Sequence, residues 1–401
     1  MIPSSHGSRL RWLTELLASW QALWQPAPFY YRRLPWAEDF SALRDYLLAL
    51  DDRDCARLEQ DPFASSVLYD WLPVVDLAES IRLPALFQAQ SPLPNAWSAH
   101  VGGRKWRQLE AFVHQVEMIP GQPLVEWCAG KGHLARTWSR FHDQPAVGLE
   151  WQPELCRLGQ QLADRQGVAL RLEQQDVMAA DAAGWLSPDA QVVALHACGD
   201  LHTRLLKQAA ISGCDLTLAP CCYQRTAEYD YRPLSRLGRE LADRYDLRLN
   251  RDDLALAVQE TVTAPKAVRR QREQANAWRL GFDLLQRELC DHDEYLPVPS
   301  LAYGRLPMHF TDFCHWAAKQ KGLSLPAAGI DWSHWEALGW QRLGEVKRLE
   351  LARHLFRRPL EIWLVLDRAL FLEEAGYHVE LGVFCERELT PRNILMKAVS
   401  N

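Results

Sequence analysis

The sequence has no uninterrupted apolar stretch near the ~20 residues that a membrane-spanning helix needs. Its opening residues, MIPSSHGSRLRW, lack the apolar core of a secretory signal. Its ten cysteines are irregularly spaced over 401 residues, unlike the framework of a disulfide-rich secreted domain. It contains no internal repeat and no low-complexity tract. These absences predict a soluble globular protein of two or three domains, and a reducing cytoplasm is its expected setting, with no membrane partner.

An excess of positive charge is also missing, since the formal net charge is −6. A protein that coats nucleic acid through bulk charge is therefore not expected. Two segments are locally basic: 261–280 holds five basic groups and one acid, and 341–360 holds six basic groups and two acids. They are either solvated helix faces or a surface for an anionic substrate.

The first hundred residues have a helical pattern of apolar residues, as in LRWLTELLASWQALW and FSALRDYLLAL, punctuated by prolines. This pattern predicts an N-terminal helical domain over 1–100. Residues 226–355 are rich in Arg, Glu, Leu and Trp and also have a mainly helical pattern. We expect them to form a helical insertion.

From residue 101 short apolar runs alternate with amphipathic helical patterns. The runs predict five strands, at 123–127, 146–150, 168–176, 191–197 and 214–220. Such alternation is typical of a parallel sheet covered by helices on both faces. Near the end of the chain, a helix that stops at Gly376 and two runs, 377–385 and 392–399, predict a hairpin that closes the sheet.

The segment LVEWCAGKGHLA, residues 124–135, combines a strand, a glycine-rich turn and the start of a helix. Glycines allow a tight turn and a close approach of the backbone to a ligand, and the helix start supplies free N–H donors. Dinucleotide folds use G-x-G-x-x-G at this corner, and here Ala135 stands in the third glycine place. A NAD(P)-dependent oxidoreductase is therefore one alternative.

S-adenosylmethionine sites instead resemble E/D-x-G-x-G-x-G, which Glu126, Cys128, Gly130 and Gly132 match with Cys in the first glycine place. A carboxylate at Glu126 attracts the cationic amino group of the methionine part, whereas it repels a pyrophosphate. We therefore prefer S-adenosylmethionine. A half-exposed strand end is the structural alternative for Glu126.

Two further acids end the next two strands. Glu150 lies 20 residues after Gly130, where a carboxylate can bind both ribose hydroxyls. Asp176 can accept a hydrogen bond from the adenine amino group while Val177 packs on the ring, or it can simply form a turn. Three acids that end three successive strands are more informative than any one of them.

The fourth and fifth strands end in HACGDL and APCCYQ, and ligands of open α/β sheets lie at these carboxyl ends. His196 is a candidate general base. Asp200 is either the N-cap of the next helix or a substrate ligand, and Tyr223 is expected to stack on a flat substrate or on adenine. The nearby thiols are packing residues, reactive groups or a soft metal site: Cys198, Cys221 and Cys222. Adjacent cysteines do not give standard zinc spacing, so no metal is predicted.

Four segments, EWCAGKGHL, LHACGDL, APCCY and LTPRNILMKAV, together resemble a subgroup of class I S-adenosylmethionine-dependent methyltransferases. The subgroup includes methyltransferase-like proteins once labelled rRNA adenine dimethylase domain-containing, and the methyltransferase domain of the glutathione S-transferase C-terminal domain-containing protein. A tRNA 2′-O-methyltransferase is a more distant member, and its cysteine/histidine zinc cluster is not evident here. The likeness covers 101–225 and about 355–401. Thr390 stands where the subgroup has Ser.

The resemblance also implies that GGRKWRQLE, 102–110, is a basic lead-in helix. Arg104 and Lys105 would then lie near the cofactor carboxylate or the substrate. It implies methyl transfer to an acceptor that the sequence does not identify, with RNA as the first expectation and a protein or a small molecule as alternatives. A non-catalytic scaffold that binds the cofactor is a further alternative.

We therefore predict an α/β, Rossmann-like class I methyltransferase fold with six parallel strands and a last, antiparallel one. The predicted domains are 1–100, a core over 101–225, an insertion over 226–355, and 356–401, which completes the core. The expected catalytic residues are His196, Asp200 and Tyr223. The expected S-adenosylmethionine-binding residues are Glu126, Cys128, Ala129, Gly130, Lys131, Gly132, Glu150, Trp151, Asp176, Val177 and His196.

Overall fold

The computed structural model describes residues 5–63, 66–88, 91–259, 266–302 and 304–401. The chain folds into two compact units. Unit 1 consists of Met1–Ala18, Glu79–Glu260 and Arg357–Asn401, and unit 2 consists of Ser19–Ala78 and Thr261–Phe356.

These units differ from the domains that the sequence predicts. The N-terminal hundred residues are divided between the two units, and residues 226–260 belong with the sheet rather than with the helical insertion. Each unit is assembled from segments far apart in the chain, which the local composition of a segment does not indicate.

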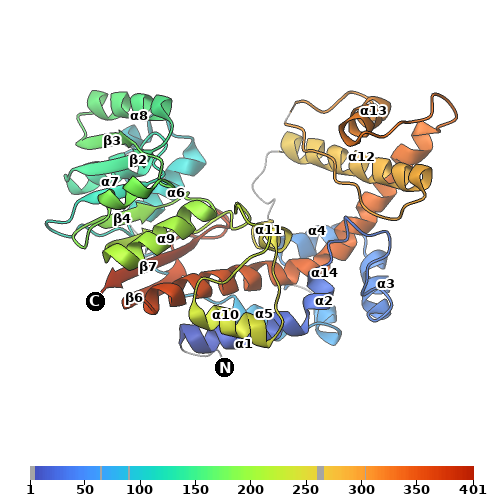
Figure 1. Ribbon diagram of the computed structural model, residues 1–401, viewed down its shortest axis with the longest axis horizontal. Helices are drawn as coiled ribbons and strands as arrows, with labels where there is room; N and C mark the ends of the chain where they lie inside the picture. The colour runs from blue at the N-terminus through green and yellow to red at the C-terminus, as the bar shows by residue number, and fades with distance from the viewer. Residues whose placement is uncertain (1–4, 64–65, 89–90, 260–265, 303) are drawn as a thin grey trace. The chain divides into compact units, whose positions relative to one another are not determined.

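Unit 1 is built on a seven-stranded sheet with the order β3-β2-β1-β4-β5-β7-β6. Helices lie on both faces of this sheet (Figure 1). Strands β1 to β5 are parallel, and β7 is antiparallel to both of its neighbours. The strands are β1 (Leu124–Trp127), β2 (Ala146–Glu150), β3 (Leu170–Gln174), β4 (Gln191–Ala194), β5 (Asp215–Leu218), β6 (Tyr377–Val383) and β7 (Ile394–Ser400).

The sheet confirms the predicted fold class. Each of the five predicted strands overlaps an observed one, and the chain ends in the expected hairpin. Because β6 pairs antiparallel with β7, six strands run in one direction and β7 runs in the other. The carboxyl ends of β1 to β5 therefore lie at one edge, where ligands of open α/β sheets bind.

The glycine-rich corner is held by the packing of two helices on one face of the sheet. All four residues of β1 are buried. Helix α7 contributes Leu134 and Trp138 to a core cluster that also contains Phe112 of α6 and Leu124 of β1. This apolar contact fixes α7 against the sheet beside β1, which limits the freedom of the loop between them.

The remaining helices complete the two units. Unit 1 contains most of α1 (His6–Ser19), and all of η2 (Asn95–Ser98), α6 (Gly103–Val113), α7 (His133–His142), α8 (Pro153–Arg165), η3 (Ala180–Trp185), α9 (Asp200–Ser212), α10 (Arg236–Arg244) and α11 (Arg251–Leu256). Unit 2 contains α2 (Gln21–Trp24), α3 (Ser41–Ala49), α4 (Asp52–Gln60), η1 (Ser66–Asp70), most of α5 (Val74–Ser80), α12 (Lys266–Cys290) and α13 (Phe310–Lys321). Helix α14 (Trp332–Glu373) contributes residues to both units.

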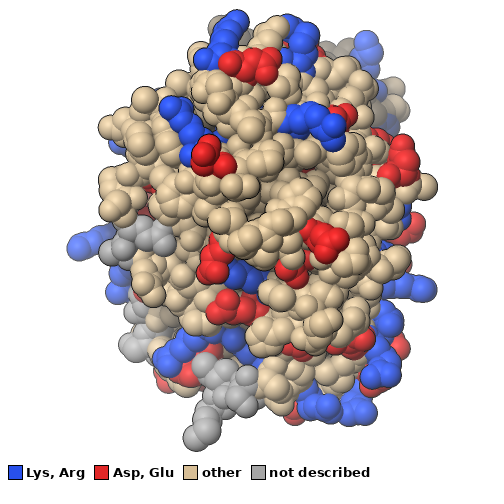
Figure 2. Space-filling model, turned by 90° about the vertical axis from the view of Figure 1, so that its left-hand side faces the viewer, with Lys and Arg blue, Asp and Glu red and all other residues tan. Residues whose placement is uncertain are grey.

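Two surface properties bear on function. Within the described ranges, every helix is too short or too polar to cross a lipid bilayer. On the face shown in Figure 2, Lys and Arg side chains are interspersed with Asp and Glu among many uncharged residues. A binding surface for a polyanion is therefore better sought in the two locally basic segments.

Candidate functional site

The loop between β1 and α7 has an unusual backbone. Cys128, Gly130 and Gly132 have φ values of 62°, 60° and 64°, all in the left-handed region. At Gly132 an added Cβ would lie 2.8 Å from Leu170 Cδ2, so a larger residue would need the sheet side chains to move. The alternating left-handed residues turn the chain tightly, and the Gly132 N–H donates to the Ala129 carbonyl at 2.9 Å within the turn.

Glu126, the third residue of β1, is buried. Its Oε2 accepts a hydrogen bond of 2.8 Å from the Ala135 N–H, in the first turn of α7. Burial raises the pKa of Glu126 to about 8, although Ala135, Lys105 and Arg136 favour the ionised form. The carboxyl group is therefore largely protonated at neutral pH, and a cationic ligand would ionise it.

Arg136, which the sequence analysis did not select, lies beside Glu126. Its Nη2 is 2.9 Å from His133 Nδ1, while its Nη1 is buried without a hydrogen-bond partner among the described residues. A buried donor without a partner is costly, and a ligand carboxylate would satisfy it. Glu126 and Arg136 together thus fit the ammonium and carboxylate groups of an amino acid. The only sequence signal is a basic residue one turn into the helix that follows the glycines.

Glu150 ends β2 and connects to the same loop. Its Oε2 accepts from the Gly130 N–H at 2.9 Å, and its Oε1 accepts from the Gln152 N–H at 3.0 Å. Each carboxylate oxygen retains capacity for a further bond, so the two oxygens can still accept from two hydroxyl groups. The neighbouring Trp151 side chain is 64% exposed and offers an apolar surface at this edge.

Asp176 follows β3, and its Oδ1 accepts from the Met178 N–H at 2.9 Å, which forms the turn considered in the sequence analysis. Val177 is buried by the protein's own atoms, so its expected packing against an adenine ring stays a prediction. The Cys128 thiol has a pKa raised to about 12, mainly by burial. Nearby acidic groups add to this shift: Glu150, Cys198, Glu126 and Asp176. The three acids that end three strands therefore converge on one loop, and the cofactor roles of these residues stay predictions.

The end of β4 carries two of the expected catalytic residues. His196 is exposed, and partial desolvation and the Lys105 ammonium group lower its pKa, so the ring is neutral at physiological pH and can accept a proton. Asp200 is the first residue of α9, whose N-cap is Gly199, so the N-cap expectation was wrong. Its Oδ2 instead accepts from the Ala227 N–H at 2.7 Å and holds the loop after β5.

Tyr223 does not face the edge of the sheet. Its side chain is fully buried, its hydroxyl donates to the Pro220 carbonyl at 3.4 Å, and the Arg368 guanidinium lies over its ring at 4.9 Å. The expectation that Tyr223 stacks on a substrate is therefore wrong in this structure. The segment APCCYQ correctly placed Tyr223 after β5, but a sequence pattern does not indicate the direction of a loop side chain.

Three thiols meet at the ends of β4 and β5. Cys198 Sγ lies 3.7 Å from Cys221 Sγ, and these atoms and Cys222 Sγ all lie within 4.8 Å of one another. Hydrogen bonds from Cys198 and Cys221 lower the pKa of Cys222, whereas the pKa of Cys221 is raised. The group is therefore more than three separate packing residues.

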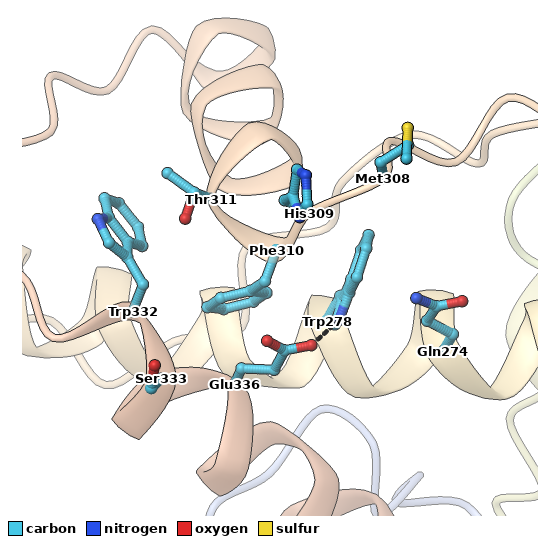
Figure 3. Close-up of a pocket in the computed structure, with 9 residues that line it drawn as sticks. All are labelled: Gln274, Trp278, Met308, His309, Phe310, Thr311, Trp332, Ser333 and Glu336. Atoms are coloured by element: carbon cyan, nitrogen blue, oxygen red, sulfur yellow. Dashed lines mark hydrogen bonds between the residues drawn. The ribbon is translucent and has the colours of Figure 1, made fainter.

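Unit 2 contains a separate cavity of about 350 Å³. Figure 3 shows the Trp278, Phe310 and Trp332 rings around it, with Trp278 Nε1 donating to Glu336 Oε1 at 2.7 Å. None of the predicted cofactor residues lines this cavity. It is therefore distinct from the site at the edge of the sheet.

Comparison with known proteins supports the interpretation of that edge. Residues 104–229 match a family model described as a methyltransferase domain. This segment contains the glycine loop and the three acids at or just after the ends of β1, β2 and β3, namely Glu126, Glu150 and Asp176. This match to a methyltransferase domain supports methyl transfer with S-adenosylmethionine as the cofactor over the NAD(P) alternative.

Solved structures are similar over part of the chain. An RNA methyltransferase from Salinibacter ruber in complex with S-adenosyl-L-homocysteine is 15% identical over 35% of this chain and 86% of that one, with a TM-score of 0.26. Coclaurine N-methyltransferase, bound to N-methylheliamine and S-adenosyl-homocysteine, is 12% identical over 45% of this chain and 62% of that one, with a TM-score of 0.27. A structure reported for the conversion of a disulfide bond into a thioacetal group during echinomycin biosynthesis is 17% identical, with a TM-score of 0.22. It matches over 24% of this chain and 43% of that one.

Proposed function

We propose that this protein transfers the methyl group of S-adenosylmethionine to RNA. The observation that carries the RNA part is a basic cluster in the first two turns of α12, which we call the α12 cluster. Its members are exposed and form no ion pair with another described residue: Lys266, Arg269, Arg270 and Arg272. Free guanidinium and ammonium groups at this density favour a polyanionic partner.

The second basic segment, 341–360, serves as a contrast. Arg342 pairs with Glu345 at 2.9 Å, and Arg353 pairs with Glu350 at 2.8 Å. Further pairs join basic residues of this segment to acids at 2.6–2.9 Å: Lys347–Glu273, Arg348–Asp52 and Arg358–Glu361. This segment is therefore mainly neutralised within the protein, whereas the α12 cluster forms no ion pair among the residues that the structure describes.

The position of the α12 cluster adds to the argument. Positive side chains near a helix N-terminus oppose the helix dipole, at about 0.3–1 kcal/mol each in exposed positions. The first turn of α12 contains no acidic residue that would offset this cost. A bound anion would offset the repulsion between the α12 cluster and the positive end of the helix dipole.

The cavity of unit 2 offers a place for a base. Gln274, which lines the cavity, lies four residues after Arg270 and so shares a face of α12 with it. Half-buried Trp332 and the Glu336 carboxylate are further lining groups. A flat ring beside hydrogen-bonding groups, next to phosphate-binding cations, suits single-stranded nucleic acid.

In this proposal the chemistry takes place at the edge of the sheet in unit 1. S-adenosylmethionine supplies a methyl group on a positively charged sulfur, which is already a good leaving group. The protein then has to orient the acceptor and remove its proton. The neutral imidazole of His196 is the proposed base. Membership of the subgroup with H-x-C-G-D and C-C-Y motifs is part of this proposal.

The test is transfer of tritium from methyl-labelled S-adenosylmethionine to the RNA, protein and small-molecule fractions of a cell extract. We expect label in RNA, and at least a roughly tenfold loss of RNA labelling in a variant with all four α12 cluster residues changed to Gln. The slope of log affinity for RNA against log salt should fall by up to about four in this variant.

A matched control removes the same charge elsewhere. Four exposed arginines are changed to Gln: Arg57, Arg157, Arg236 and Arg248. This variant should label RNA like the wild type, and all three proteins should bind the cofactor equally. Label in protein or small molecules alone would contradict the RNA acceptor, as would equal RNA labelling by the two variants.

A further inference from the structure

The three thiols at the ends of β4 and β5 have the spacing of metal ligands. Three thiolates at about 2.3 Å from one zinc ion, in tetrahedral geometry, lie about 3.8 Å apart. Cys198 Sγ and Cys221 Sγ are 3.7 Å apart, and Cys222 Sγ lies within 4.8 Å of both. Small side-chain rotations would bring the third sulfur into place.

The backbone explains how two adjacent cysteines can point to one side. Neighbouring residues of an extended chain direct their side chains to opposite faces. Cys222 instead has a φ of 48°, in the left-handed region, which turns its side chain toward that of Cys221. The sequence objection based on spacing therefore does not apply. A non-glycine residue in this conformation costs about 1–2 kcal/mol, and ligation of a metal would compensate for that cost.

The scaffold around the thiols is well connected. Cys198 and Cys221 form a parallel β-bridge, and the Gly199 N–H donates to the Cys221 carbonyl at 3.1 Å. Gly199 has a φ of 55°, and a Cβ there would lie 2.0 Å from the Arg225 carbonyl oxygen, so only glycine allows this approach. The Arg225 N–H donates in turn to the Cys222 carbonyl at 2.9 Å. The backbone that carries the three ligands is thus held in place before any ion binds, and only the side chains need to rotate.

The charges and the exposure of the cluster also fit. Three thiolates and one divalent ion carry a net charge of −1, which the nearby guanidinium groups of Arg392 and Arg225 would offset. Cys221 is buried, whereas Cys198 and Cys222 are only half-buried. One side of the cluster therefore remains accessible to a solute.

We propose that Cys198, Cys221 and Cys222 bind one zinc ion through three thiolates, leaving a fourth, open coordination position. Each thiol releases its proton when the ion binds, and water occupies the fourth position. Three protein ligands and an exchangeable one are typical of zinc sites that act on substrates, whereas structural zinc sites have four protein ligands. This proposal does not depend on the identity of the methyl acceptor.

The test uses the full chain, reduced and freed of metal, then loaded with Zn²⁺ and passed over a desalting column. We expect about one zinc ion per chain by mass spectrometry of the metal content, for both the wild type and Cys290→Ser, which removes an exposed thiol outside the cluster. Each of Cys198→Ser, Cys221→Ser and Cys222→Ser should lower the zinc content at least roughly tenfold.

A second measurement uses only the wild-type protein, so its result does not depend on whether the cysteine variants fold. Co²⁺ added to the metal-free wild-type protein should give an intense thiolate-to-cobalt charge-transfer band and the visible bands of a tetrahedral site. Failure of the wild type to retain zinc or to give this spectrum would overturn the proposal. It would also be overturned by equal zinc contents in all variants, or by a Cys198–Cys221 disulfide in protein kept under reducing conditions.

Discussion

Replacing Glu126 by Gln should abolish the pH dependence of cofactor binding. Burial raises the pKa of this carboxyl group to about 8, so the group carries a proton over most of the neutral range. The ammonium group of the cofactor is attracted by the ionised form. Binding must therefore release the proton, and its free-energy cost grows as the pH falls.

The magnitude follows from that pKa. About 10% of the Glu126 carboxyl groups are ionised at pH 7 and about 1% at pH 6. The apparent Kd of the wild type should thus fall roughly tenfold per pH unit from pH 6 to 7.5, or about 1.4 kcal/mol per unit. The Glu126→Gln variant cannot titrate, although its amide oxygen can still accept from the Ala135 N–H. The two proteins should bind equally at about pH 6 and differ by roughly 50-fold near pH 8, a difference within the value of one charge-assisted hydrogen bond.

Calorimetry in buffers of different ionisation enthalpy measures the released proton directly. At pH 7 we expect a release close to one proton per cofactor for the wild type and close to none for Glu126→Gln. His196→Gln is the control, because the pKa of His196 is already lowered and its loss should leave the release unchanged. Unchanged proton release in Glu126→Gln, or its disappearance in His196→Gln, would refute this account of Glu126.

The ligand-free protein should show a related trend in stability. The pKa of Glu126 rises from about 4.5 in the unfolded chain to about 8 in the fold. Between these values the unfolded chain has lost the proton that the folded protein keeps, so the free energy of unfolding falls as the pH rises. Glu126→Gln should reduce this fall, as measured by urea unfolding from pH 5 to 8.

Two further predictions concern stability. Gly132→Ala should cost more than the roughly 1–2 kcal/mol of left-handed strain, because its Cβ also meets two leucine side chains, and it should weaken cofactor binding. Gly167 also has a positive φ, but open space surrounds it, so Gly167→Ala should cost only the strain. Equal losses in the free energy of urea unfolding for the two variants would contradict the role of the leucine contacts at Gly132. Asp367→Ala should cost roughly 3–5 kcal/mol, because it removes the buried acceptor of four hydrogen bonds from residues 231–235. The exposed Asp243→Ala should change the free energy of unfolding by less than about 1 kcal/mol, and a similar loss in both would contradict the reasoning.

The sheet and the acidic edge could be predicted because both depend on local patterns. Apolar runs between amphipathic helices imply a parallel sheet, and parallel strands bring their carboxyl ends together. Glu126 and Glu150 could therefore be selected from their positions alone. Both contact the glycine loop through hydrogen bonds to its backbone or to the helix that follows it.

Side-chain directions outside regular strands could not be predicted in this way. Tyr223 follows β5 as expected but is buried under Arg368, because the loop turns it inward. The left-handed turn at Cys222 overturned a spacing argument that assumed extended backbone. The division of the chain into two units was not predicted either. Residues 19–78 and 261–356 form one unit by packing between segments far apart in sequence, which local patterns do not indicate.

The place of β7 in the sheet has a consequence for how the protein is made. β5 ends at Leu218, but its neighbour β7 begins only at Ile394. At about 5–20 residues per second, the ribosome needs roughly 10–35 s to synthesise the intervening segment. During that interval the backbone edge of β5 has no β7 to pair with and is open to other strands. The edge of β5 is thus open to aggregation while residues 219–393 are being translated, and chaperone engagement should concentrate in that window.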